Sequence, residues 1–273
     1  MASKASIHSG QSAVLATDLL TYYRQVSHSP LTVIDLETTG SIVAKARVIE
    51  VSLLQGSLEE GIQHQETHLI NPGVKVPAMI TRVTGITPAM VGQGKHPEDV
   101  WPDLLPRLEA GILTAHNIDF DYRFLQSEYR HMDFAYSRPP TARFCTVLLS
   151  RLLLADLPSR SLPDLVRHFD FNVGQSHRAE ADTQACWLLA NHLLRQIQQE
   201  SDEQLLEKFG QQWVRLRDAA KLLKCSKSKA QALLDQHGAE SRASRRNSRF
   251  LYRRRDIERL YYEQQGQQLS LNT

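Results

Sequence analysis

Short apolar runs alternate along the chain with stretches in which apolar residues recur every three or four positions. The runs are rich in β-branched residues and are bounded by turn residues such as Asn71, Pro72 and Gly73, a pattern typical of strands. They predict strands in LTVIDLET (31–38), ARVIEVSLLQG (46–56), HQETHLINPG (64–73), AGILTAHN (110–117) and the first part of TARFCTVLLSRLL (141–153). The first three follow one another directly, which predicts a β-meander.

The periodic stretches predict helices at residues 13–26, 118–132 and 179–199, and in the second part of 141–153. A meander followed by strand-helix units indicates an α/β domain with a mixed sheet. Residues 196–212 are polar and charged with few large apolar side chains, so we expect a linker there.

Composition bounds the class of protein. The chain has 273 residues, of which 41% are apolar and 23% charged, enough for one ordinary globular domain and a smaller one. Its three cysteines lack metal-ligand spacing, which indicates reduced thiols. The first residues lack a signal-peptide pattern, and no apolar run reaches the length of a membrane helix. We therefore expect a cytoplasmic protein with no membrane contact.

The net charge of +2 conceals an asymmetry. Residues 213–262 contain 14 Lys and Arg against 5 Asp and Glu, a net +9. Of the totals of 32 and 30, the remaining residues hold 18 and 25, a net −7. An acidic body with a basic C-terminal segment favours an anionic partner for that segment.

Two acids interrupt the first predicted strand. Asp35 and Glu37 are two positions apart, so on a strand they project from the same face. Like charges this close repel, and a divalent cation between them resolves the conflict. The alternative is a solvated pair at the end of an edge strand.

A second acidic position follows the strand at 110–117. Asn117 is placed to cap the next helix, and either Asp119 or Asp121 could reach the end of the sheet, although residues two apart on a helix face different ways. Acids in a first helical turn are also explained by the helix dipole alone.

A third position combines an imidazole with a carboxylate. His177 stands before the helix at 179–199, and Asp182 lies in its first turns, so both could reach one point above the helix start. Taken singly, a histidine in this place is more often a surface or capping residue.

Together, VIDLETTG (33–40), HNIDFDYRFL (116–125) and HRAEAD (177–182) resemble the three motifs of the DEDDh 3′–5′ exonucleases, the group that includes the epsilon proofreading subunit of bacterial replicative DNA polymerase and RNase T. The resemblance spans about residues 30–195 and includes VPAMITRVTGIT (76–87). It implies an RNase H-like fold, a five-stranded mixed sheet flanked by helices.

The resemblance also implies roles for individual residues. The metal ligands would be Asp35, Glu37, Asp121 and Asp182, with Asp121 selected over Asp119 by the preceding Phe120. His177 would be the general base. Four converging carboxylates favour hard cations, Mg²⁺ or Mn²⁺, and two ions about 4 Å apart suit an in-line displacement that releases nucleoside 5′-monophosphates.

Residues near these motifs are candidates for substrate binding. They are Thr38, Thr39, Gly40, Ile86, His116 and Asn117. A simple strand-ending turn at 38–40 and core packing of Ile86 are equally good interpretations.

The basic segment resembles the winged helix-turn-helix of excisionase-like and MerR-like DNA-binding domains. Its candidate phosphate contacts are Lys224, Lys227, Lys229, Arg245, Arg246, Arg249, Arg253, Arg254 and Arg255. A solvated basic face, or one that docks a protein, is the alternative.

The sequence therefore predicts a metal-dependent 3′–5′ exonuclease with a basic nucleic-acid-binding module. It favours DNA over RNA as the nucleic-acid partner and leaves both open as the preferred substrate. The expected parts are a helical extension (1–29), the exonuclease domain (30–195), a linker (196–212), the basic domain (213–263) and a tail (264–273). The alternatives are a non-catalytic DNA-binding regulator and a polymerase-associated proofreading subunit. Polymerase or repair proteins are candidate partners.

Overall fold

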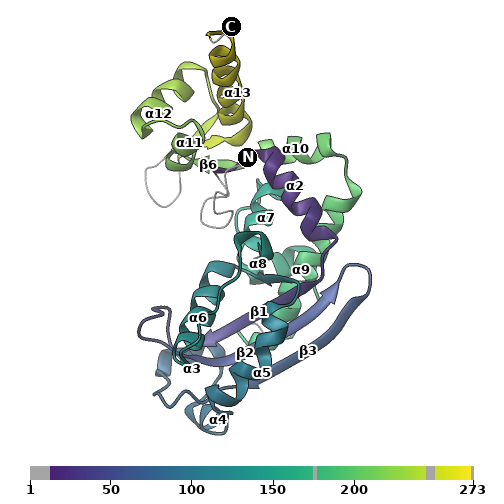
Figure 1. Ribbon diagram of the computed structural model, residues 1–273, viewed down its shortest axis with the longest axis vertical. Coiled ribbons are helices and arrows are strands. Elements are labelled where there is room, and N and C mark those ends of the chain that lie inside the picture. The colour runs from purple at the N-terminus through teal and green to yellow at the C-terminus, as the bar shows by residue number, and fades with distance from the viewer. Residues whose placement is uncertain (1–12, 175–176, 244–249, 272–273) are drawn as a thin grey trace. The chain divides into compact units, whose positions relative to one another are not determined.

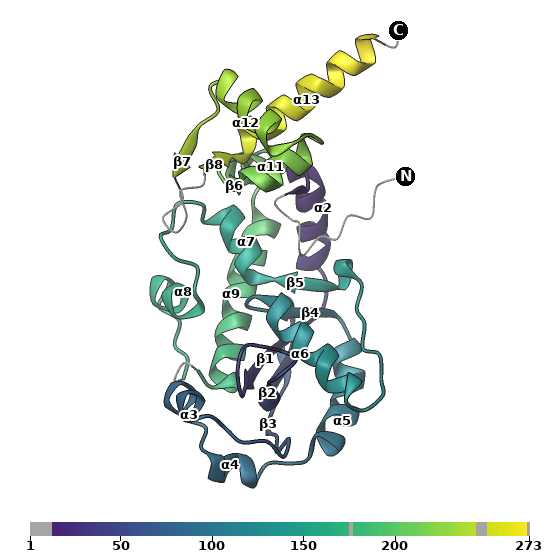
Figure 2. The same ribbon diagram turned by 90° about the vertical axis from the view of Figure 1, so that its left-hand side faces the viewer.

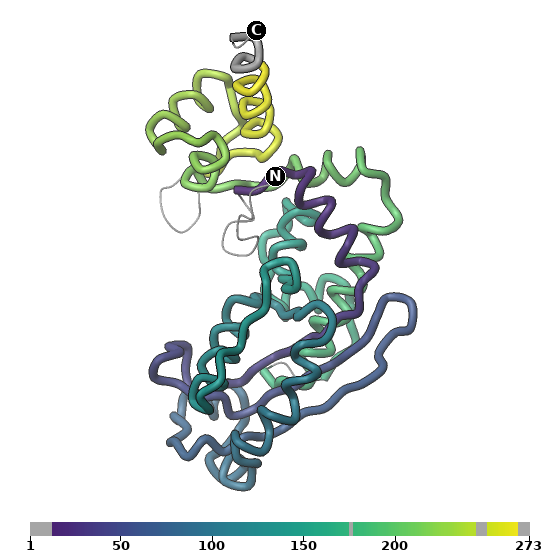
Figure 3. Tube along the Cα trace, viewed as in Figure 1, coloured from purple at the N-terminus to yellow at the C-terminus, as the bar shows by residue number. Residues whose placement is uncertain are grey.

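The computed structural model describes residues 13–174, 177–243 and 250–271, and for 267–271 it describes the backbone only. These residues form two compact units. The sheet unit comprises Gln25–Val147 and Ser159–Gln196, and the terminal unit comprises the described residues up to Arg24, Leu148–Pro158 and Ile197 onward. Figure 1 labels the helices and strands, and Figure 3 follows the chain through them.

A five-stranded mixed sheet with the order β3-β2-β1-β4-β5 is the centre of the sheet unit. β1 and β2 pair antiparallel, as do β2 and β3, whereas β4 lies parallel to β1 and β5 parallel to β4. The strands are β1 Leu31–Thr38, β2 Val48–Ser57, β3 Gly61–Leu69, β4 Ile112–Ala115 and β5 Arg143–Cys145. The predicted meander and mixed sheet are confirmed.

Helices cover both faces of this sheet. α9 (Ala179–Gln199) lies on one face, and α5 (Pro97–Glu109) and α6 (Ile118–Arg130) lie on the other, as Figures 1 and 2 show. The first four residues of β1 and the first seven of β2 are buried in succession, because each of these strands has helices on both sides. This double burial explains why both read as apolar runs rather than alternating patterns.

Short helices complete the sheet unit. Between β3 and α5 the chain forms α3 (Ala78–Thr84) and α4 (Pro88–Gly92), and between β4 and α9 it forms the 3-10 helix η2 (Pro140–Ala142) and α8 (Leu162–Phe169). Thr87 caps α4 by accepting a hydrogen bond from the Met90 amide. A small core of Ile49, Val76, Ile86 and Val91 holds α3 and α4 to the sheet.

The terminal unit joins segments that are distant in the sequence. Its elements, two of which extend into the sheet unit, are α2 Ala16–Ser27, α7 Thr146–Leu153, α10 Asp202–Gly210, β6 Trp213–Arg215, α11 Leu216–Leu222, α12 Lys227–Gln236, β7 Ser241–Ala243, β8 Phe250–Arg253 and α13 Arg254–Leu271. The three strands form a sheet in the order β6-β8-β7. Along the chain, α11 and α12 are followed by the antiparallel pair β7 and β8 and then by α13.

The prediction of a linker at 196–212 is wrong. Residues 202–210 form α10, whose start carries a capping box between Ser201 and Gln204. Leu205 and Phe209 are fully buried, and Phe209 packs edge-on against Tyr23. Two apolar residues four positions apart make a stripe narrow enough for the surrounding polar residues to mask it in the sequence.

Among the described helices, none has a stretch both long and apolar enough to span a lipid bilayer.

Arg254 is a buried structural residue, so its prediction as a phosphate contact is wrong. Its side chain is 0% exposed. The guanidinium donates to the Gln212 side-chain oxygen from Nε at 2.9 Å and from Nη2 at 2.6 Å. Nη1 donates to the Val14 carbonyl oxygen at 2.5 Å and to Glu258 at 2.9 Å. The arginine therefore ties residues before α2 to the start of α13.

This arrangement predicts that Arg254→Ala lowers the free energy of unfolding by about 3 kcal/mol, because it leaves buried acceptors without their donor. Arg255→Ala is the matched control, since its side chain is 47% exposed and its loss should cost less than about 0.5 kcal/mol. Urea unfolding followed by near-ultraviolet circular dichroism measures both. Equal shifts in the two variants would contradict the structural role of Arg254.

Candidate active site

β1 places two carboxylates on the face that α9 covers. Asp35 and Glu37 are half-buried, whereas Ile34 and Leu36 between them are buried on the opposite face. In the pairing with β2, Asp35 lies opposite Ser52 and Glu37 lies opposite another acid, Glu50. Cross-strand partners share a face, so three acids lie on this side of the sheet.

α9 brings a third candidate ligand to this face. Asp182 lies in the first turn of the helix, and its Oδ2 accepts a hydrogen bond from the His177 amide at 3.0 Å. One carboxylate oxygen each from Asp35, Glu37 and Asp182 lies within 4.8 Å of the other two. We call Asp35, Glu37, Asp121 and Asp182 the carboxylate cluster.

α6 supplies the fourth member of the cluster. Asp121 is 3% exposed, whereas Asp119 is half-buried and faces another way. The amides of Leu36 and of Asp121 itself hydrogen-bond the Asp121 carboxylate, which holds it beside Leu36, the residue between Asp35 and Glu37 in the sequence. The structure thus brings together the four acids that the sequence indicated.

The cluster is electrostatically strained. Burial, followed by the charges of Asp121, Asp182, Glu37 and Glu50, raises the pKa of Asp35 well above its usual range. Burial and then the charge of Asp182 raise the pKa of Glu37 to about 8, and burial raises that of Asp121 to about 8 against the hydrogen bonds from the two amides.

The donor set suits a hard divalent cation. The cluster offers carboxylate oxygens and no sulfur or nitrogen, and such ligands select Mg²⁺ or Mn²⁺ over softer ions. A cation would also relieve the repulsion that raises these pKa values. The residues present therefore fit the metal that the family resemblance implied.

His177 lies at the edge of the cluster. Its side chain is exposed, and its backbone has a positive φ of 66°. Few non-glycine residues adopt this left-handed conformation, although histidine does so more often than most, and contacts with the surroundings help to hold it. The hydrogen bond to Asp182 is one such restraint, and it keeps the histidine beside a candidate ligand.

The turn after β1 is largely occupied by its own hydrogen bonds. Thr38 Oγ1 donates to the Gly40 carbonyl oxygen at 2.8 Å. The Thr39 amide donates to the Arg47 carbonyl oxygen at 2.9 Å, and Thr39 Oγ1 accepts from the Arg47 amide at 3.0 Å. Thr39, a candidate for substrate binding, therefore has both its amide and its hydroxyl engaged in closing the loop.

Two further candidates for substrate contact, Ile86 and His116, make contacts within the protein, and for Ile86 the core-packing interpretation holds. Ile86 is 0% exposed and packs in the core of α3 and α4, while Met79 and Val83 of α3 are the exposed apolar residues of this segment. Both ring nitrogens of His116 are hydrogen-bonded, Nδ1 to Thr146 Oγ1 and Nε2 to the Arg160 carbonyl oxygen, each at 2.9 Å. His116 thereby fixes the end of β4.

Asn117 is exposed and in a left-handed conformation, with φ of 76°. Its side chain makes no capping hydrogen bond to α6, contrary to the expectation that it caps this helix. Its side chain is open to solvent at the start of the helix that carries Asp121.

Glu50 and Arg178 border the cluster, and sequence analysis assigned neither of them a role. Arg178 forms an ion pair with Glu50 at 2.6 Å. The available signal was the charge of Glu50 within the apolar run of β2, which has the same form as the signal of Asp35 and Glu37 in β1.

The basic residues of the terminal unit divide into exposed and engaged groups. Lys224, Lys227 and Lys229 are exposed at the turn before α12 and in its first residues. Arg253 is 12% exposed, lies over the Trp213 ring at 3.9 Å and pairs with Glu240. The predicted contacts Arg245, Arg246 and Arg249 lie outside the described residues.

Arg255 is half-exposed, and its guanidinium donates to Glu240 at 2.6 Å and to Gln211 at 2.9 Å. It therefore contributes to the same internal network of side chains as Arg253.

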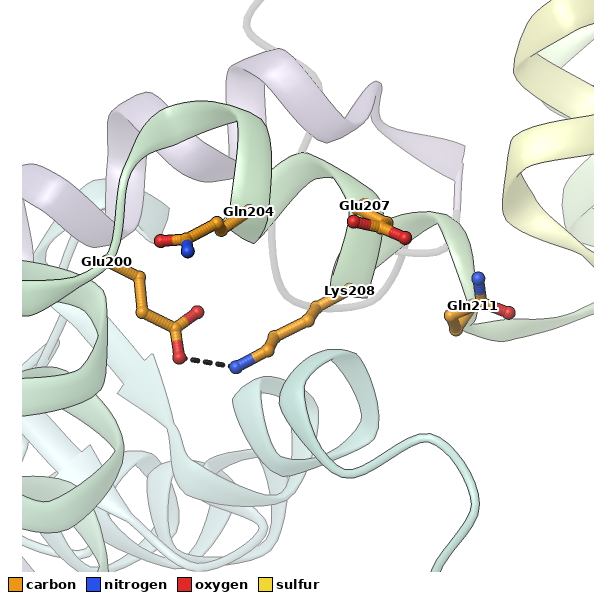
Figure 4. Close-up of a pocket in the computed structure, with 5 residues that line it drawn as sticks. All are labelled: Glu200, Gln204, Glu207, Lys208 and Gln211. Carbon is orange, nitrogen blue, oxygen red and sulfur yellow. Dashed lines mark hydrogen bonds and ion pairs between the residues drawn. The ribbon is translucent and has the colours of Figure 1, made fainter.

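A surface hollow in the terminal unit is a separate feature (Figure 4). Its lining consists of Glu200, Gln204, Glu207, Lys208 and Gln211, and Lys208 pairs with Glu200. None of the five is a member of the carboxylate cluster, so this hollow is not the candidate active site.

Comparisons with known proteins bear on the sheet unit. Residues 32–189 match the model of the Exonuclease family. The chain is 33% identical over 154 residues to the DNA polymerase III subunit epsilon of Aquifex aeolicus, a match that covers 55% of this chain and 73% of that protein. It is 30% identical over 169 residues to the 3′-5′ exonuclease DinG of Bacillus subtilis, covering 61% of this chain but 18% of that protein.

A solved structure supports the same fold. E. coli Exonuclease I in complex with a dT13 oligonucleotide superposes with a TM-score of 0.55 and 17% identity, over 60% of this chain and 40% of that one. At this identity the likeness concerns the fold, which agrees with the five-stranded mixed sheet.

The raised pKa values predict how stability depends on pH in the absence of divalent ions. Because the pKa of Glu37 rises from 4.5 to about 8 on folding, the folded state holds a proton that the unfolded chain releases. This contribution to stability is complete below the unfolded pKa and is lost as the pH rises through the folded value. In EDTA, the free energy of unfolding of Glu37→Gln should therefore rise relative to that of the wild type as the pH is raised. The increase should be on the order of 2 kcal/mol from about pH 5 to about pH 8.5.

Glu66→Gln is the control, because hydrogen bonds from His68 and His64 outweigh burial and lower the pKa of Glu66. This variant should show no such gain as the pH rises. Thermal unfolding at both pH values, with and without Mg²⁺, gives the comparison. A gain for Glu37→Gln that does not change with pH would contradict the strained cluster.

Proposed function

We propose a function from the premise that this chain belongs to the Exonuclease family and that its residues 32–189 form a 3′–5′ exonuclease domain. The proposed activity is the removal of nucleotides from the 3′ ends of DNA by metal-dependent hydrolysis at the carboxylate cluster. The observation that carries the proposal is the placement of Asp35, Glu37 and Asp182 within 4.8 Å, with Asp121 buried beside them. The chain spans only 12% of one curated relative and 18% of another, so the activity of the whole protein is part of the proposal.

Asp35, Glu37, Asp121 and Asp182 would hold two divalent ions, Mg²⁺ or Mn²⁺. When bound, such ions acidify the attacking water and stabilise charge on the attacking and leaving oxygens. The contribution of the protein is to hold four carboxylates at a spacing they would not adopt unaided.

His177 is the proposed general base. It accepts a proton from the water that attacks the terminal phosphorus, and the bond between phosphorus and the 3′ oxygen of the preceding nucleotide breaks. The products are a nucleoside 5′-monophosphate and a strand one nucleotide shorter with a 3′-hydroxyl. The exposed imidazole and the hydrogen bond from the His177 amide to Asp182 support this role.

DNA is the proposed substrate. Exonuclease I is described with a dT13 oligonucleotide, and several relatives are named as DNA polymerase III proteins. Gly40, Thr38 and Asn117 lie near the ends of β1 and β4 and remain proposed contacts for the terminal nucleotide.

The basic segment is proposed to bind nucleic acid as a winged helix-turn-helix. α11 and α12 are joined by a short turn and followed by a β-hairpin, and the exposed lysines lie at the start of α12. In this type of module the second helix enters the major groove with its first residues toward the bases.

A second candidate function is proofreading within a polymerase, with a polymerase or repair protein as partner. The match to 73% of a DNA polymerase III subunit epsilon favours it. The non-catalytic regulator is disfavoured, because the cluster is complete.

The test of catalysis uses the full chain with 5′-end-labelled single-stranded DNA, the matching RNA, and a duplex with a recessed 3′ end, each with Mg²⁺ and with EDTA. The proposal expects a ladder that shortens from the 3′ end of DNA with Mg²⁺ only. A stable label in every lane would overturn it.

Asp121 and Asp119 provide a matched pair of variants. Asp121→Asn should lower kcat by at least about 100-fold, since it removes a charge from the cluster, whereas Asp119→Asn should change kcat by less than about 3-fold. Steady-state hydrolysis of an oligonucleotide measures both. Equal or reversed effects would show that the second motif uses the other acid.

The terminal unit makes a separate prediction. Lys227→Glu combined with Lys229→Glu should raise KM for duplex DNA by about 10-fold or more with kcat nearly unchanged, because binding remote from the reacting bond is shared by ground and transition states. The difference should shrink as salt rises, since fewer counterions are released. Lys95→Glu, an exposed lysine of the sheet unit, is the control. An unchanged KM would favour a protein partner for this face.

A further inference from the structure

Glu50 is a fifth acid beside the carboxylate cluster, but its oxygens face donors of the protein. It is 1% exposed on β2, directly opposite Glu37. Arg178 Nη2 donates to its Oε1 at 2.6 Å and Arg178 Nε donates to its Oε2 at 3.3 Å. The Ala179 amide donates to the same Oε2 at 2.9 Å. This set of three hydrogen bonds is called the Glu50 clamp.

The clamp fixes the segment that carries the proposed base. Arg178 and Ala179 lie between His177 and Asp182, and Ala179 is the first residue of α9. Their hydrogen bonds to Glu50 fix the start of α9 against β2. Glu50 lies opposite Glu37 of the neighbouring strand, so the helix start is held beside the cluster. The strained φ of His177 immediately precedes the clamp, so the clamp helps to hold the conformation that this residue would otherwise leave.

The charge of the clamp also matters to the cluster. Arg178 lies close enough to lower the pKa of Glu37, and it offsets part of the opposite effect of Glu50 on the same group. A buried carboxylate engaged by a guanidinium and an amide is poorly placed to accept a metal ion as well. The geometry therefore distinguishes Glu50 from the four acids of the cluster, although it shares their face.

We infer that Glu50 and Arg178 are positioning residues that hold His177 and Asp182 in register with Asp35 and Glu37, an inference that rests on the function proposed above. They act as one unit, because the Arg178 guanidinium neutralises the buried Glu50 and the Glu50 carboxylate orients that guanidinium. They touch neither the substrate nor the ions. Loss of either should disturb the base and one ligand while leaving the proposed substrate contacts Gly40 and Asn117 in place.

The test compares Glu50→Gln, Arg178→Gln and the double variant in the full chain. Each single variant should lower kcat by about 10- to 100-fold with KM for the oligonucleotide within about 2-fold, the range for outer residues that orient ligands. The double variant should lose no more than about the larger single loss, since the two residues form one interaction. Because it leaves no unpaired buried charge, it also serves if a single variant folds poorly.

Glu66→Gln is the matched control. Glu66 also pairs with an arginine, Arg107, and lies on the neighbouring strand β3. The same substitution there should leave kcat within about 2-fold. A loss as large as that of Glu50→Gln would mean that any ion pair in the sheet unit matters equally, and would overturn the inference.

Hydrogen exchange separates this inference from the proposed function, because it requires no activity. In Glu50→Gln, the amides of residues 177–183 should exchange at least about 10-fold faster while those of β1 keep their protection. Unchanged exchange at 177–183 would overturn the clamp even in an active enzyme. An inactive wild type with the expected exchange pattern would overturn only the proposed function.

Two kinetic outcomes also decide against the inference. Additive losses in the double variant would mean that Glu50 and Arg178 act independently. A Mg²⁺ half-saturation concentration raised in Glu50→Gln but not in Arg178→Gln would make Glu50 a metal ligand instead.

Discussion

Repulsion among four carboxylates at the end of β1 is the constraint on which the surrounding structure depends. Asp35, Glu37, Asp121 and Asp182 come from three separate elements, and burial together with their mutual charge makes ionisation unfavourable. The protein opposes this by surrounding the acids with donors, such as the amides of Leu36 and His177. The packing of the sheet unit holds these acids together, because a close-packed sheet with helices on both faces cannot separate its elements to relieve the repulsion.

The two units handle charge in opposite ways. In the sheet unit, Arg47 binds Glu128 and Arg178 binds Glu50, so two arginines neutralise buried acids of this unit. In the terminal unit the excess of positive charge is partly used internally, since Arg254 is buried and Arg253 lies over Trp213. A count of basic residues therefore overstates the positive charge that is available to a phosphate backbone. The exposed lysines at the start of α12 are a better measure of that charge.

Sequence reasoning succeeded where a property belongs to any regular element. Asp35 and Glu37 share a face because every strand has a period of two, and Asp121 and Asp119 diverge because every helix turns by about 100° per residue. It failed where an outcome depends on register or on distant partners. Glu50 lies on the face of the cluster only because the pairing register sets it opposite Glu37, and the packing of Ile86 and the hydrogen bonds of His116 involve partners that no local pattern contains. The buried stripe of Leu205 and Phe209 was hidden by its polar neighbours.

The tie between Arg254 and Val14 affects the order in which the chain can fold during synthesis. The Ala16 amide also donates to Glu258. The two contacts join residues 240 and 242 positions apart, so the segment around the start of α2 gains these hydrogen bonds only after the C-terminal residues have been made. The strands of the sheet unit and most of α9, by contrast, are all translated before residue 197. On the ribosome the sheet unit can form while α2 still lacks its partners, so α2 emerges before the strands but is secured after them.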